Sequence, residues 1–95
     1  MPRTLIVNTL HISDRVAAKL EEKHGLRADE VRDRIEGVGL LPFRWDDDPQ
    51  RGPRALVWTS LGADAVLVVL YPSRSGDPEE WHLGSAYTYG LDVTG

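Results

Sequence analysis

The stretch that decides the fold is Ala65-Val66-Leu67-Val68-Val69-Leu70-Tyr71. Its residues are apolar at every position, so both faces of a strand formed here need cover, which is typical of a strand in the interior of a sheet. The run also lacks the charges that protect an edge strand from pairing with another chain. It therefore predicts a central strand with a neighbour on each side. At seven residues, it is shorter than the roughly 18 that a membrane helix needs.

The segments on either side predict further strands and two helices. Strands are expected at residues 4–10, 40–45, 54–61 and 79–89, with turn-rich loops at 46–53 and 72–78. A first helix is expected after an N-cap at Ser13 and should end at Gly25, and a second should span residues 28–36. The predicted order is β-α-α-β-β-β-β. This is an α+β fold, in which two N-terminal helices pack on one face of a small antiparallel sheet and leave the other face open to a ligand.

Alternation along the last strand predicts which of its side chains share a face. One face should carry Trp81, Leu83, Ser85 and Tyr87, and the other His82, Gly84, Ala86 and Thr88. The first set suits a core or an interface, while aromatic rings on an open sheet can also stack on bases.

Length and composition predict one soluble domain. The chain has 95 residues, a length that forms a single hydrophobic core. The segment 90–95 is expected to be a loose tail. It has no cysteine, so disulfides, thiol nucleophiles and thiolate metal sites are excluded. Its first residues do not resemble a secretion signal, and a cytoplasmic location is therefore expected, with no membrane contact.

The net charge of −4 is distributed unevenly. Residues 1–54 hold ten of the eleven Lys and Arg and ten of the fifteen Asp and Glu, so they sum to zero. Residues 55–95 hold one Arg and five acids, which gives −4. Proteins that bind nucleic acid through their overall field are basic. Any contact with RNA must therefore depend on a local patch in the first half or on a basic partner, and we expect the binding of RNA by the chain alone to be weak.

Three groups of residues are candidates for chemistry. Lys23 and His24 close the first helix, where they can hold a phosphate and move a proton or can simply complement the helix dipole. Arg51 and Arg54 can bind phosphate or pair with the acids at 46–48. A metal site is not expected, because no two histidines have the spacing of ligands on one helix. No cofactor motif is present either.

The chain resembles the BrnT-like branch of the RelE/ParE toxin superfamily. The resemblance covers residues 10–88 and lies in Lys23-His24-Gly25 at a helix end, the Arg-led strand at Arg54, the Val-rich strand and Ser85-Ala86. It implies a RelE-like α+β fold and a cytoplasmic toxin of a type II toxin–antitoxin pair. Such a toxin is a metal-independent endoribonuclease held inactive by an antitoxin, as a homodimer or a toxin–antitoxin hetero-oligomer.

The resemblance implies roles for individual residues. Lys23 and His24 match the helix-end pair of the family, and Arg54 matches the arginine that opens its second long strand. We assign proton transfer to His24 and His82, phosphate binding to Lys23, Arg51 and Arg54, and an orienting or stacking role to Tyr87.

The chain departs from the family pattern in its last strand. Many relatives have Ser-Ala-Arg where this chain has Ser85-Ala86-Tyr87, and the basic C-terminal segment is replaced by residues whose only charge is acidic. The alternative hypothesis is a non-catalytic module that uses the same fold to bind a partner chain.

Overall fold

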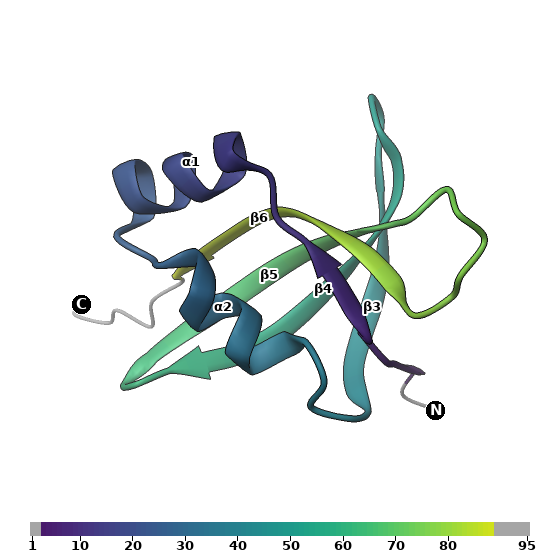
Figure 1. Cartoon of the computed structure of the whole chain (residues 1–95), viewed down its shortest axis with the longest axis horizontal. Coiled ribbons are helices and arrows are strands. Elements are labelled where there is room, and N and C mark those ends of the chain that lie inside the picture. Colours follow the sequence, from purple (N-terminus) through teal and green to yellow (C-terminus); the bar gives the residue numbers. More distant parts are fainter. Residues whose placement is uncertain (1–2, 89–95) are drawn as a thin grey trace.

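The computed structural model describes residues 3–88, in which two helices lie against one curled sheet (Figure 1). The expected tail at 90–95 lies outside the described residues. The elements, in chain order, are β1 (Arg3–Leu5), β2 (Thr9–His11), α1 (Asp14–His24), α2 (Ala28–Ile35), β3 (Leu41–Asp48), β4 (Gly52–Leu61), β5 (Asp64–Pro72) and β6 (Glu80–Thr88).

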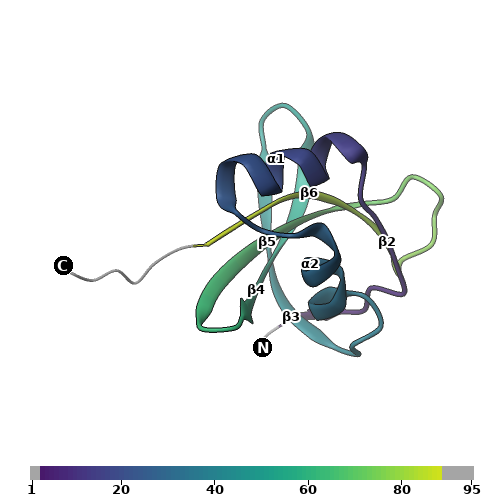
Figure 2. The same cartoon turned by 60° about the vertical axis from the view of Figure 1, so that its left-hand side comes forward.

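The predicted fold class was wrong. Two strands, not one, precede the helices, and the six strands form a mixed sheet in the order β1-β3-β4-β5-β6-β2, in which β2 runs parallel to β6. β1 pairs with β3 at one edge of the sheet, whereas β2 pairs with β6 at the other. Only residues 6–8 separate these two strands, so the sheet must curl until both edges reach the same N-terminal segment (Figures 1 and 2). The apolar pattern at 4–10 indicates a strand but does not identify its partners.

β3 is longer than predicted because its acidic end is paired. The residues 46–48 were expected in a loop, yet they continue the ladder with β4, where Asp46 faces Arg54. Arg54 forms ion pairs with Asp46 and Asp48, and opposite charges on neighbouring strands stabilise the pairing.

The interior position of the apolar run is confirmed, since β5 lies between β4 and β6. Val66, Val68 and Leu70 are buried in the core. Val69 is also buried, but on the opposite face and outside the core cluster. Cover on both faces explains why this strand carries no polar side chain between Ala65 and Leu70.

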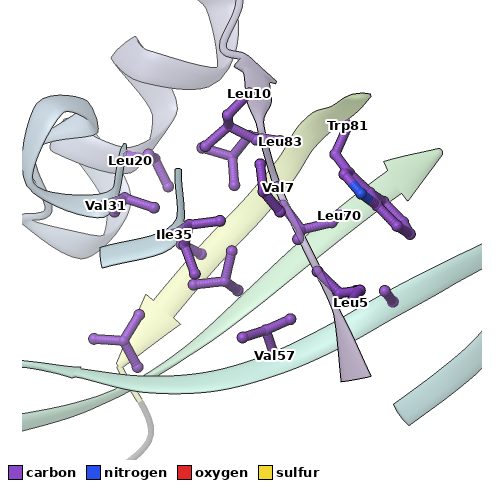
Figure 3. Packing of buried hydrophobic residues seen from close by; sticks show 14 of the residues in the cluster. Leu5, Val7, Leu10, Leu20, Val31, Ile35, Val57, Leu70, Trp81 and Leu83 are labelled. Carbon is purple, nitrogen blue, oxygen red and sulfur yellow. The ribbon is translucent and has the colours of Figure 1, made fainter. Parts of the chain in front are cut away.

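Caps hold α1 at both ends, and buried leucine, valine and isoleucine side chains anchor both helices. Ser13 caps α1 by accepting a hydrogen bond from the Val16 amide at 3.2 Å, and Gly25 ends the helix with a φ of 63°, both as predicted. Figure 3 shows the core side chains contributed by the helices, the N-terminal segment and the sheet, among them Leu20, Val31, Ile35, Val57, Leu70 and Leu83.

A β-bulge at Gly84 changes which face each later residue of β6 occupies. Leu70 pairs with Leu83, but Val69 pairs with Ser85, so Gly84 is an extra residue in the ladder. The predicted faces are therefore wrong beyond Leu83. Trp81, Leu83 and Ala86 are buried on the core side, whereas His82, Ser85 and Tyr87 share the opposite face.

Candidate functional site

Two adjoining hollows form one groove between α1, β6 and the turn that joins β3 to β4. The smaller has a volume of about 240 Å³ and the larger about 870 Å³, and both are bounded by Val16, Arg51 and Gly84. We call their union the basic groove. Its polar and titratable lining consists of Lys19, Lys23, His24, Gln50, Arg51, Tyr71, Ser73, Arg74, Ser75, His82 and Ser85.

The charge of this groove is opposite to that of the whole chain. Four Lys or Arg side chains line it, and within residues 3–88 no carboxylate does. None of these four cations forms an ion pair with an acid of residues 3–88. A hollow lined by one sign of charge concentrates ligands of the opposite sign. The groove is therefore suited to a polyanion, although the protein as a whole carries −4.

α1 supplies one wall of the groove. Lys19, Lys23 and His24 follow one another at helical spacing, which puts them on one side of the helix. Gly25 ends α1 directly after His24, so the imidazole lies at the helix terminus. The His24 ring lies 5.7 Å from the Tyr87 ring, measured between centroids. The structure thus brings together three residues that the sequence singled out, Lys23, His24 and Tyr87.

Arg51 lies opposite this wall, at the turn between β3 and β4, whose tip rises behind α1 in Figure 2. Its guanidinium carbon is 5.6 Å from the centre of the Tyr71 ring, a distance at which cation–π attraction operates. The Tyr71 hydroxyl donates a hydrogen bond to Asp48 at 3.1 Å. Tyr71 also packs against Gly84, where any Cβ would overlap its ring. The bulge glycine thus makes room for the aromatic support of Arg51.

Arg54, in contrast, does not line the groove. Its Nε donates to Asp46 at 2.7 Å, and its Nη1 lies 3.6 Å from Asp48. The hydrogen bond to Asp46 raises the pKa of Arg54 above its usual range. The backbone amide of Gln50 is the main group that lowers the pKa of Asp48. Of the two readings of this arginine, ion pairing with the acidic residues is the one realised. A role for Arg54 in phosphate binding stays a prediction.

His82 lies at the other end of the groove and is held by a cluster that the sequence analysis missed. The His11 ring stacks on it with centroids 4.8 Å apart, because β2 and β6 pair in the register His11 to His82. His11 Nε2 is hydrogen-bonded to Glu80 Oε2 at 2.5 Å. The Ser75 hydroxyl donates a hydrogen bond to Glu80 Oε1, also at 2.5 Å. These contacts, Ser75 first, lower the pKa of Glu80.

Lys19, Arg74, His11 and Glu80 are the residues of this region that sequence reasoning missed. Lys19 stands four residues before Lys23 and could have been found from helical spacing alone. The others depend on the parallel pairing of β2 with β6 and on the path of the loop after β5, for which no local signal exists.

Neither a metal centre nor a membrane helix is found in the described part of the chain. Residues 3–88 contain no group of three or more His, Asp or Glu side chains arranged to hold a metal ion. No helix among them is long and apolar enough to cross a membrane.

Comparison with known proteins gives no relative from which a function could be transferred. No protein-family model matches the chain, and no match was found among curated proteins or solved structures.

Proposed function

We propose that this chain is a metal-independent endoribonuclease that acts as the toxin of a type II toxin–antitoxin pair. The observation that carries the proposal is the basic groove, which in residues 3–88 of an acidic protein collects four unpaired cations and two histidines and no carboxylate. Among polyanions, RNA carries its own nucleophile in the 2′-hydroxyl, so cations and histidines such as those of the groove are the groups that its cleavage requires.

The proposed reaction is a transesterification within the RNA. A base takes the proton of the 2′-hydroxyl, whose oxygen attacks the adjacent phosphorus. The bond to the 5′-oxygen breaks as an acid protonates it, leaving a 2′,3′-cyclic phosphate and a 5′-hydroxyl. His24, which lines the same hollow as Lys23 and Arg51, is the proposed proton-transfer group at the reacting phosphate, since histidine changes charge near neutral pH. His82 lies at the other end of the groove, so its proposed proton transfer serves a phosphate bound at that end. Lys23 and Arg51 stabilise the charge on the phosphorane, and Tyr87 orients His24 or the substrate.

The proposed partner is an antitoxin that presents basic side chains. Residues 55–95 carry −4, and a complementary charge accelerates association. The assembly is proposed to be a homodimer or a toxin–antitoxin hetero-oligomer in the cytoplasm.

The test is cleavage of a defined single-stranded RNA by the purified chain in EDTA. The expected products end in a 2′,3′-cyclic phosphate. His24→Ala should slow cleavage by about 10²-fold or more, the usual contribution of a general acid or base. Arg15→Ala is the matched control, because Arg15 is an exposed cation on the same helix and lies outside the groove lining. Cleavage that stops in EDTA, or that is equal in both variants, would contradict the proposal.

The second candidate function is a non-catalytic protein-interaction module. The observation in its favour is that Arg54, the arginine matched to the family, is engaged by Asp46 and Asp48. This function predicts that induced expression does not arrest growth and that the purified chain leaves RNA intact while still binding its partner. Growth arrest that His24→Ala relieves would decide for the enzyme.

A further inference from the structure

Trp58 is exposed on the face of the sheet that lies opposite the core. Its neighbours along β4, Val57 and Thr59, pair with Val68 and Val66 of the core, so by alternation Trp58 points the other way. Its side chain is 42% exposed. Among the described residues, the other exposed large apolar side chains are Val38, Leu40 and Trp45, none of which lies on this face. A large aromatic ring is therefore open to solvent on this face of the sheet.

The register of the sheet connects Trp58 to the basic groove. Trp58 pairs with Leu67, and Leu67 pairs with Tyr87, whose ring lies beside that of His24. Neighbouring strands are about 4.8 Å apart, so Trp58 lies roughly 10 Å from Tyr87. Leu67 and Tyr87 are half-buried and lie between the Trp58 ring and the His24 ring.

Cations lie at both ends of this row of side chains. Lys23 and Arg51 line the groove beside His24. At the far end, Arg44 is exposed on β3 and pairs with Leu56, which makes it the diagonal neighbour of Trp58 on the same face. A flat aromatic ring between cationic groups is the arrangement by which proteins hold single-stranded nucleic acid, with bases on the rings and phosphates on the cations.

The size of the exposed surface favours a base over a protein partner. A stable protein interface buries about 800 Å² on each side and has an apolar centre. Here one apolar ring is exposed and its apolar neighbours Leu56 and Leu67 are half-buried, an exposed area that suits a single nucleobase.

We propose that Trp58 is a stacking platform for an unpaired nucleobase of an RNA strand whose phosphates lie in the basic groove. The proposal rests on the proposed function, and it narrows the substrate to single-stranded RNA. Duplex RNA is excluded because its bases are stacked within the helix and cannot reach a ring on the protein surface.

Binding of a short 2′-O-methyl oligoadenylate tests this without cleavage, because the methyl group blocks the nucleophile. Trp58→Ala should raise the Kd about 5- to 150-fold, which corresponds to the loss of one base–aromatic stack. Trp58→Phe should recover part of the affinity. Trp45→Ala is the matched control, since Trp45 is 41% exposed but packs beside Phe43 and Trp81 on the other face, and its Kd should change less than about twofold.

An abasic strand of the same length separates stacking from charge. It should bind wild type and Trp58→Ala equally. Equal loss of affinity in the Trp45 and Trp58 variants would overturn the proposal by indicating general damage to the sheet. An unchanged Kd in Trp58→Ala would overturn it as well and would leave the ring to a protein partner. Binding without cleavage in the unmodified RNA would refute the nuclease alone, whereas no binding by wild type would refute both proposals.

Discussion

Two hollows of opposite charge meet at the end of α1. His24 lines the basic groove, and the next residue, Gly25, lines a hollow of about 520 Å³ whose charged residues are Glu30, Asp33, Arg34 and Asp64. We call this second region the acidic hollow. The left-handed turn at Gly25 redirects the chain, so that consecutive residues line hollows of opposite charge. A net charge of −4 therefore describes neither surface, because the fold separates acids and bases that are mixed in the sequence.

The greatest loss of stability should follow from loosening α1, the helix that lies between the two hollows. Leu20 is 1% exposed and anchors α1 in the core. Leu20→Ala should lower the free energy of unfolding by about 2–5 kcal/mol, because it removes buried methyl groups and leaves a cavity. Urea denaturation measures this. Leu40→Ala is the control at an exposed position, and a similar loss there would show that burial is not the cause.

A smaller loss of stability is expected from a substitution at Gly84, which lines the basic groove. Gly84→Val places a side chain where the Tyr71 ring lies and should cost about 1–3 kcal/mol of unfolding free energy. Ser60→Val, at an exposed site on β4, should change it by less than about 0.5 kcal/mol. Equal melting curves for the two variants would mean that the bulge tolerates a side chain.

Charge reversal tests the comparison directly. Arg51→Glu in the basic groove should weaken binding to single-stranded RNA about tenfold or more, the effect of losing one charge-assisted contact. Arg34→Glu changes the net charge equally but lies in the acidic hollow, and it should change the affinity less than about twofold. With four groove cations, the slope of log K against log salt should be about −3 for wild type and about −2 for Arg51→Glu. Identical behaviour of the two variants would show that overall charge alone governs binding.

The smallest change in stability should come from lowering the pH, which acts on the cluster of His11, Ser75, Glu80 and His82 at the end of the groove. The pKa of Glu80 lies below its ordinary value of 4.5 in the folded protein, because Ser75 and His11 bond to the carboxylate. Its stabilising contribution is therefore complete above that ordinary value and is lost as the pH falls through the folded pKa. The difference in stability between wild type and Glu80→Gln should shrink as the pH is lowered below about 4.5. Glu79→Gln is the neighbouring control, and a gap that widens on acidification would contradict the assignment.

Local patterns predict the elements of this fold but not its closure. The apolar run of β5, the Ser13 cap and the Gly25 stop are local signals, and each is confirmed. The parallel pairing of β2 with β6 joins residues some seventy positions apart, and nothing in the N-terminal sequence identifies that partner. The predicted fold class was wrong because this long-range pairing has no local signal.

The candidate site was predictable to the same extent. Lys23, His24 and Arg51 were found because a helix end and a turn expose cations wherever the rest of the chain lies. Tyr87 joins His24 only because the bulge at Gly84 reverses its face, and a glycine within a strand was the available signal for that bulge. The cluster of His11, Glu80 and His82 had no such signal.

The N-terminal segment that bridges both edges of the sheet also sets an order of events during synthesis. β2 leaves the ribosome some seventy residues before its partner, residues 80–82 of β6. Contacts between such distant segments form late, because the intervening chain must be ordered first. β6 also carries His82 and Ser85, so the groove has no floor until then. The groove of a nascent chain is consequently incomplete until β6 has been made.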